Sequence, residues 1–102
     1  MVSKQKMKWE VLTAVIKLSQ SNKPFTADEI AIMAGYDKAE TSHYIKWMLD
    51  ERIVRRVLKK KGGNLYVFDG TTSKYTRKWI LAICDDLGYE RIDRYGRVKE
   101  DK

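Results

Sequence analysis

Cysteine, histidine and proline occur only once each in this chain of 102 residues, and Asn and Gln together number four. A single cysteine excludes a disulfide framework within the chain. One cysteine with one histidine also excludes a zinc site of the multi-cysteine kind. The scarcity of Asn and Gln favours a thermophilic source. We therefore expect neither a bound metal nor a stabilising cross-link in this protein.

Long hydrophobic runs are also missing. No stretch of 18 consecutive apolar residues occurs, so no transmembrane helix is predicted and we expect no membrane partner. The N-terminal sequence MVSKQKMKWE is charged but is not followed by an apolar segment, which argues against a signal peptide. The simplest expectation is a cytoplasmic protein.

The sequence offers little for catalysis. It has no phosphate-binding glycine loop and no nucleophile elbow. His43 has no second histidine and no identifiable Asp partner, and Cys84 fits a small apolar filler better than a nucleophile. We therefore predict a protein that is not an enzyme, with no catalytic residues, no cofactor and no evident small-molecule ligand.

Positive charge is what the chain has in excess. The net charge is +7 and the pI is near 9.5, which points towards a polyanionic partner. The charge is unevenly spread: residues 53–61 hold five basic and no acidic residues, whereas residues 25–52 hold three basic and six acidic residues. A polyanion would therefore gain most of its affinity from residues 53–61 and from the basic first 24 residues.

Residues 37–51 have the pattern of an amphipathic helix. Asp37 is a cap residue, and Glu40 stands at capping-box spacing from it. Thr41, Tyr44, Ile45 and Met48 share one face at helical spacing. The opposite face is small, polar and basic, as suits insertion into a DNA major groove, and consists of Lys38, Ala39, Ser42, His43 and Lys46. The bland alternative is that exposed polar residues on such a helix need no explanation.

Other elements flank this helix. A short helix before it has its own capping box, Thr26 with Glu29, and Gly35 marks the turn between the two. Further helices are predicted over residues 4–20, with Ser3 as the candidate cap, and over residues 73–87, ended by Gly88. Residues 53–60 and 65–68 are predicted strands, joined by the basic, glycine-containing turn KKKGGN.

Two helices at this spacing, followed directly by a basic hairpin, resemble the winged helix-turn-helix family. The likeness covers roughly residues 10–70 and extends to Leu87; it points to small regulators of archaea and their viruses and to MarR- and ArsR-like repressors. It implies a mostly helical α+β fold, with a three-helix core, a two-stranded β-hairpin wing and an additional C-terminal helix. Residues 1–88 would form this domain, and residues 89–102 a charged tail, either mobile or folded as a short hairpin. Arg52 departs from the pattern, because many members have Gly at the end of the recognition helix; the helix is expected to end differently here.

The resemblance implies sequence-specific binding of double-stranded DNA by a dimeric transcription regulator, in the host cytoplasm if the protein is viral. Residues 38–51 would enter the major groove, and residues 59–64 would lie on the backbone or in the minor groove. Only one of Arg55 and Arg56 is expected to face the duplex, since they alternate along a strand. An ordinary solvated turn is the alternative for the wing. Its expected DNA-binding residues are Arg55, Lys59, Lys60, Lys61, Gly62 and Asn64.

The first and last helices carry more apolar surface than one small core needs. Their apolar arcs span roughly 220° and 200° at 100° per residue. Burial of the surplus across a two-fold axis predicts a homodimer, with a disulfide between two copies of Cys84 as a minor possibility. The alternative is that the two helices simply pack on each other within one chain. The expected interface residues are Trp9, Ile16, Trp79, Ile80, Ile83, Cys84 and Leu87.

A second hypothesis is a winged-helix module for protein–protein contact, in which the acidic residues 25–52 bind a partner and DNA plays no part. The basic hairpin favours DNA, and the net negative charge of residues 25–52 keeps the alternative open. RNA binding is a lesser variant, because no aromatic strand motif of the RNA-binding kind is present.

Overall fold

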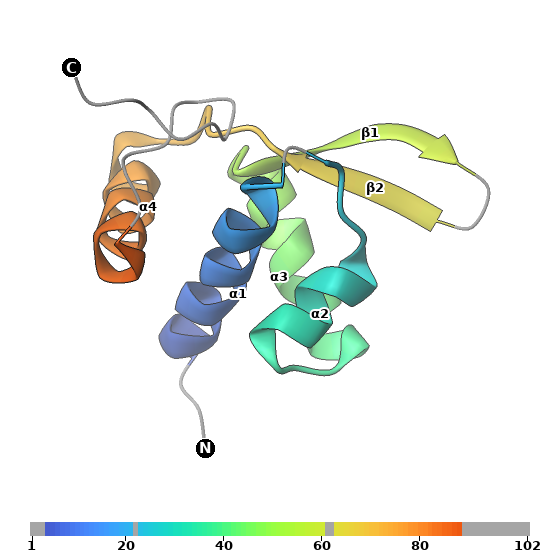
Figure 1. The fold of residues 1–102 in the computed structure, drawn as a ribbon, viewed down its shortest axis with the longest axis horizontal. Coiled ribbons are helices and arrows are strands. Elements are labelled where there is room, and N and C mark those ends of the chain that lie inside the picture. Colours follow the sequence, from blue (N-terminus) through green and yellow to red (C-terminus); the bar gives the residue numbers. More distant parts are fainter. Residues whose placement is uncertain (1–3, 22, 61–62, 89–102) are drawn as a thin grey trace.

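The computed structural model describes residues 4–21, 23–60 and 63–88, with only the backbone described for residues 4, 58–60 and 63. The chain forms an α+β fold that is mostly helical, with one two-stranded antiparallel sheet (Figure 1). None of the described helices is long and apolar enough to cross a membrane. The elements in chain order are α1 (Lys4–Ser19), α2 (Ala27–Ala34), α3 (Lys38–Asp50), β1 (Val54–Lys60), β2 (Gly63–Phe68) and α4 (Lys74–Leu87). The predicted class and element order are confirmed, while Ser3 and the tail 89–102 lie outside the described residues.

Helix α1 is the centre of the core. It lies between α4 on one side and α2 with α3 on the other (Figure 1). A helix covered from two sides needs a wide apolar arc, and its residues Val11, Leu12, Val15 and Ile16 are all completely buried. The breadth of this arc is therefore explained within a single chain.

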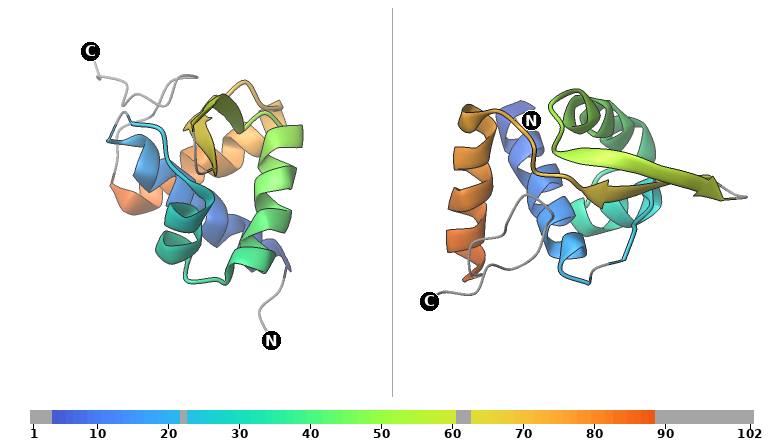
Figure 2. Two further views of the ribbon diagram at one scale, coloured as in Figure 1. Left: turned by 90° about the vertical axis from the view of Figure 1, so that its right-hand side faces the viewer. Right: turned by 90° about the horizontal axis from the view of Figure 1, so that it is seen from above.

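Helix α4 packs along α1, as Figure 2 shows from above. Gly88 ends it with a φ of +73°, as predicted, and Ser73, predicted as its first residue, caps its N-terminus. The indole rings of Trp9 and Trp79 meet across the two helices, with centroids 6.0 Å apart. The described part of the chain buries most of the apolar face of α4 without a second copy.

This burial corrects the expected dimer interface. Four of its seven residues are less than 3% exposed in the single chain: Ile16, Ile80, Ile83 and Cys84. They cannot reach a second copy because they already fill the space between the chain's own helices. The thiol of Cys84 is likewise buried within one chain, which gives no support to a disulfide between two copies. Trp9, Trp79 and Leu87 remain partly exposed.

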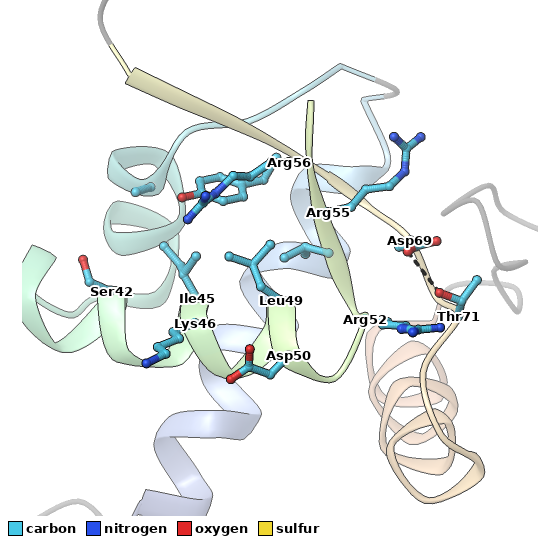
Figure 3. A pocket seen from close by; sticks show the side chains of 13 residues that line it. Ser42, Ile45, Lys46, Leu49, Asp50, Arg52, Arg55, Arg56, Asp69 and Thr71 are labelled. Atoms are coloured by element: carbon cyan, nitrogen blue, oxygen red, sulfur yellow. Dashed lines mark hydrogen bonds between the residues drawn. The ribbon is translucent and has the colours of Figure 1, made fainter. Parts of the chain in front are cut away.

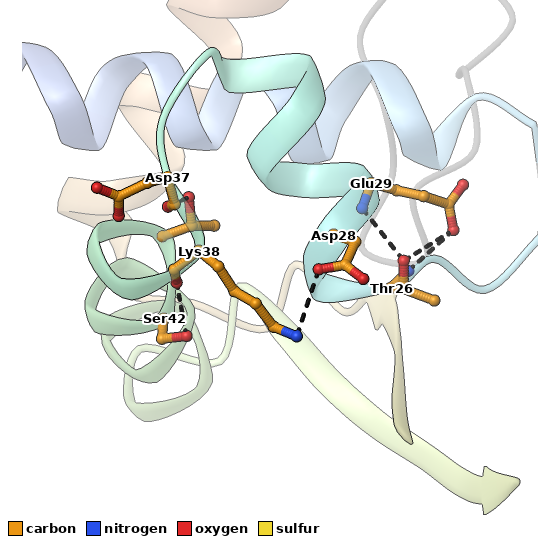
Figure 4. A network of polar contacts seen from close by, with 7 residues as sticks. Thr26, Asp28, Glu29, Asp37, Lys38 and Ser42 are labelled. Atoms are coloured by element: carbon orange, nitrogen blue, oxygen red, sulfur yellow. Dashed lines mark hydrogen bonds and ion pairs between the residues drawn. The ribbon is translucent and has the colours of Figure 1, made fainter. Parts of the chain in front are cut away.

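The α2–α3 pair begins with the capping box predicted at Thr26. Its hydroxyl oxygen accepts a hydrogen bond from the Glu29 N–H at 3.1 Å, and its own N–H donates to the Glu29 carboxylate at 3.1 Å (Figure 4). Gly35 ends α2 with a φ of +81°, the left-handed conformation that glycine adopts at little cost. Both sequence predictions are confirmed.

The cap of α3 is simpler than predicted. The Asp37 carboxylate accepts a hydrogen bond from the Glu40 N–H at 2.8 Å, but the return bond from the Asp37 N–H to the Glu40 carboxylate is not made. A hydrogen bond between the two carboxyl groups, and then their like charge, raise the pKa of Glu40 above its ordinary value. Only half of the expected capping box is present, because the two acidic side chains interact with each other.

Tyr36 ties the turn before α3 to α1. Its hydroxyl donates a hydrogen bond of 2.7 Å to the Glu10 carboxylate, 26 residues earlier in the chain. Burial, the hydrogen bond to Glu10 and the nearby negative charges together raise the pKa of Tyr36 to about 12. The bond fixes the start of α3 relative to the helix at the centre of the core.

The two strands pair in antiparallel register, with Val54 opposite Phe68 and Arg56 opposite Tyr66. The register becomes irregular beyond Val57, and β2 begins at Gly63, two residues earlier than predicted. Phe25 forms an isolated bridge on the other side of β2: its N–H donates to the Tyr66 carbonyl at 2.9 Å, and the Tyr66 N–H donates back at 2.8 Å. The base of the hairpin is thereby fastened to the segment that leads into α2.

Candidate nucleic-acid interface

The outer face of α3 comprises Lys38, Ala39, Ser42, His43 and Lys46, and all five side chains are exposed. On the opposite side Thr41, Ile45 and Met48 are at most 4% exposed, and Tyr44 is half-buried. The predicted division of this helix into a core face and a solvent face is therefore confirmed. Nothing in the described structure covers the polar side.

Two residues of this face already have partners within the protein. The Lys38 ammonium lies 3.5 Å from the Asp28 carboxylate of α2, with both side chains about two-thirds exposed or more (Figure 4). The Ser42 hydroxyl donates to the Lys38 carbonyl at 2.8 Å. Exposed ion pairs contribute at most about 1 kcal/mol, so a competing phosphate can displace this one. Lys46 forms no ion pair among the described residues, which makes it the more available cation.

A groove of about 810 Å³ separates α3 from the hairpin (Figure 3). Four basic side chains line it, against the two acidic side chains of Asp50 and Asp69. We call it the basic groove. Its basic residues are Lys46, Arg52, Arg55 and Arg56, and the rest of its lining is Ala27, Ser42, Ile45, Leu49, Val54, Tyr66 and Thr71.

Arg55 and Arg56 are neighbours on β1. They point to different sides of the strand, as adjacent residues do (Figure 3). Both are exposed, and both are among the residues that line the basic groove. The expectation that at most one of them faces a duplex stays a prediction, and the exposure of both leaves two candidate contacts.

The remaining wing residues divide into two groups. Asn64 lies on β2 with a half-buried side chain. Lys59 and Lys60 belong to β1, but their side chains are not described, and Lys61 and Gly62 lie outside the described residues. The basic tip therefore stays a sequence-based prediction, whereas the base of the hairpin is placed beside α3.

Arg52 and Arg56 were missing from the set of site residues predicted from sequence. The signal for Arg56 was present in the run of basic residues after position 53. Arg52 was noticed only as a departure from a glycine pattern. The expectation that α3 ends differently from the glycine pattern is wrong, because Arg52 itself has a left-handed φ of +59°. Only the residue type departs from that pattern.

A second cavity, of about 390 Å³, lies between α1, α3 and α4 and was not anticipated. Trp47 lines it, and the Lys8 ammonium lies 5.0 Å from the centroid of the Trp47 ring. Trp47 therefore faces α1, away from the hairpin. Its other lining residues are Gln5, Glu51, Tyr75, Thr76 and Trp79. Among the described residues no group of three or more potential metal ligands comes together.

Comparison with known protein families finds no family model that matches the chain, and comparison with curated proteins finds no match. The function of this chain must therefore be inferred from the chemistry of its exposed surface.

Proposed function

We propose that this chain is a winged helix-turn-helix protein that binds double-stranded DNA with sequence preference and acts as a transcription regulator. In this proposal α3 is the recognition helix in the major groove, and the β1–β2 hairpin is the wing on the neighbouring backbone or minor groove. The observation that carries the proposal is the continuity between the exposed outer face of α3 and the basic groove, joined at Ser42 and Lys46.

The chemistry of these two surfaces matches the two parts of a duplex. A major groove about 12 Å wide admits one helix. Its base edges offer hydrogen-bond acceptors to lysine, and both donors and acceptors to serine. Phosphates, in contrast, are bound best by arginine, whose planar group donates two parallel hydrogen bonds. Ser42, His43 and Lys46 would contact bases, while Arg55 and Arg56 would contact the backbone beside them.

The proposal includes a homodimer, because two recognition helices about 34 Å apart would read a two-fold related site. The surface available for such a contact is smaller than the sequence indicated. It consists of the partly exposed Trp9, Trp79 and Leu87 together with Tyr75, which is 70% exposed.

One observation favours a second candidate function, a protein–protein contact through α2. Ile32 is 81% exposed and Met33 46% exposed, and the acidic Asp28 and Glu29 stand one turn before them. An apolar pair with acidic neighbours suits a basic partner protein, whereas its negative charge would repel the phosphates of DNA. This surface and the basic groove are separate, so the two functions can be tested separately.

The deciding experiment is a titration of a random duplex and of pooled genomic duplex fragments over a salt series. We expect tight binding, selection of particular fragments, and a logarithm of affinity that falls by about 0.9 per logarithm of salt for each phosphate neutralised. Replacing Lys59, Lys60 and Lys61 by Ala should flatten that slope and weaken binding to all sequences alike.

The control replaces Lys74 and Lys78, two exposed lysines of α4 that lie outside both basic segments, by Ala. It removes two of the three charges and should leave the slope close to that of the unmodified protein. Absence of salt-dependent binding in the unmodified protein would reject DNA as the partner. Equal slopes for the wing variant and the α4 variant would remove the wing from the interface.

A further inference from the structure

Arg52 stands apart from every other residue in the described part of the chain. It is the only residue other than glycine there with a positive φ, at +59°; the others are Gly35, Gly70 and Gly88. A side chain at such a φ crowds its own backbone, which is why glycine predominates at these positions. A residue other than glycine in this strained conformation is expected to have a compensating role elsewhere in the structure.

The backbone at this point cannot avoid the left-handed turn. The Ile53 N–H donates to the Met48 carbonyl at 2.8 Å, and the Arg52 N–H donates to the Leu49 carbonyl at 3.2 Å. These two bonds are those of a Schellman motif, in which the residue between helix and strand is left-handed. Ile53 and Met48 are both completely buried, so the turn also closes the core. Folding alone would be served best by glycine at position 52.

The Arg52 side chain is not used within the fold. It is exposed and lines the basic groove, beyond the end of α3 (Figure 3). It forms no ion pair among the described residues, although Asp50 and Asp69 line the same groove. The Asp69 carboxylate instead accepts a hydrogen bond of 3.0 Å from the Thr71 hydroxyl. The guanidinium group is therefore presented to an external anion.

We propose that Arg52 binds a phosphodiester group of the DNA backbone and that this contact sets the position of α3 along the duplex. The inference rests on the proposed function. Because two backbone hydrogen bonds and a buried isoleucine hold the turn, the Arg52 side chain starts from a fixed point at the end of α3. A phosphate bound there positions the whole helix without reading any base. The same position thus weakens the fold and strengthens binding.

Arg52→Gly tests this, because its effects on stability and on binding have opposite signs. The melting temperature should rise, by about 4 °C for a domain of this size, since the left-handed turn is relieved. Affinity for DNA should fall about eightfold at 0.1 M salt, and the salt slope should decrease by about 0.9, the effect of one phosphate contact. The affinities for random and for preferred duplexes should fall by the same factor, since a phosphate contact carries no sequence information.

Two further variants separate charge from backbone. Arg52→Asn is neutral and tolerates the left-handed turn, so it should lose affinity as the glycine variant does. Arg52→Lys keeps both the charge and the strain, so it should retain the slope and the melting temperature of the unmodified protein. Lys78→Ala serves as the control for loss of one exposed charge outside the groove.

Each outcome distinguishes this inference from the function on which it rests. If the unmodified protein does not bind duplex DNA, both proposals fail together. If it binds, and the Gly and Asn variants bind DNA with the same affinity and salt slope as the unmodified protein, Arg52 is not a phosphate contact and the proposed function stands. A fall in melting temperature for Arg52→Gly would show that the arginine side chain serves the fold, which overturns the inference from strain.

Discussion

Helices α3 and α4 both pack against α1, but they leave different side chains in solvent. The apolar stripe of α4 ends in the core, where Ile80, Ile83 and Cys84 are buried. The outer face of α3 is entirely polar or small, and the basic groove begins beside it. Of these two helices, α3 is therefore the one whose exposed surface is charged, and this surface is the one that the proposed function uses.

The ends of the same two helices repeat the contrast. α4 ends at Gly88, with a φ of +73°, and α3 passes through the same left-handed geometry at Arg52. Where only the fold is served, the residue is the one that the backbone prefers. Beside the basic groove, the residue is one that the backbone resists. The mismatch between local geometry and residue type at Arg52 therefore supports the proposed role of the basic groove.

The largest effect is expected from Ile83→Asp, which tests the claim that α4 is part of the chain's own core. A carboxylate at a position only 1% exposed has no partner, and it should lower the free energy of unfolding by about 4 kcal/mol or more. For a domain of marginal stability this amounts to near-complete unfolding. Thermal melts followed by circular dichroism, with sedimentation on the same samples, measure it.

Ala82→Asp on the same helix is the control, because Ala82 is exposed and lies outside the proposed dimer contact, so the free energy of unfolding should change by less than about 1 kcal/mol. An Ile83→Asp protein that melts normally but sediments at half the mass of the unmodified protein would reinstate the dimer interface originally expected there.

The difference between these helices also explains what the sequence could predict. Helical spacing alone sorted α3 correctly into a buried side with Thr41, Ile45 and Met48 and an exposed side. The same spacing on α1 and α4 identified apolar arcs but not what covers them. A pattern along one helix contains no information on whether its neighbour belongs to the same chain, and here the neighbours are the chain's own.

Caps show a similar limit. Thr26 with Glu29 and Asp37 with Glu40 have the same spacing, yet only the first forms the reciprocal box. The hydroxyl of threonine can donate and accept, whereas two carboxyl groups in the second pair repel or share a proton. The prediction for Arg52 was wrong for a different reason, since its left-handed turn depends on the burial of Ile53. That burial is set by packing at a distance.

An effect of intermediate size is expected from Lys46→Ala. If Lys46 pairs with guanine acceptors, its loss should narrow the gap between preferred and random DNA by roughly 1–3 kcal/mol. Competition titrations of the two duplexes at one salt concentration give this difference. Lys78→Ala is the control, because Lys78 is an exposed lysine of α4 that belongs to neither the outer face of α3 nor the basic groove. Equal weakening of both duplexes by Lys46→Ala would identify a phosphate contact in place of a base contact.

The smallest effect is expected from Tyr36→Phe, which removes the hydrogen bond that joins α1 to the turn before α3. Loss of this 2.7 Å bond to the Glu10 carboxylate should lower the free energy of unfolding by about 1 kcal/mol at pH 7. Urea denaturation measures this loss, and Glu10→Gln, which keeps an acceptor, should lose less.

The pH dependence of this loss has a definite sign. The pKa of Tyr36 is about 12 in the folded protein and 10.0 for an ordinary tyrosine, so between these values the folded state holds the proton more tightly than the unfolded chain does. Its stabilising contribution is complete below pH 10 and disappears as the pH rises through 12. The difference between the unmodified protein and Tyr36→Phe should therefore be constant from pH 7 to about pH 9.5 and shrink above that. A difference that grows with pH in this range would show that the hydroxyl does not hold its proton against Glu10, and that α3 is fastened to α1 by packing alone.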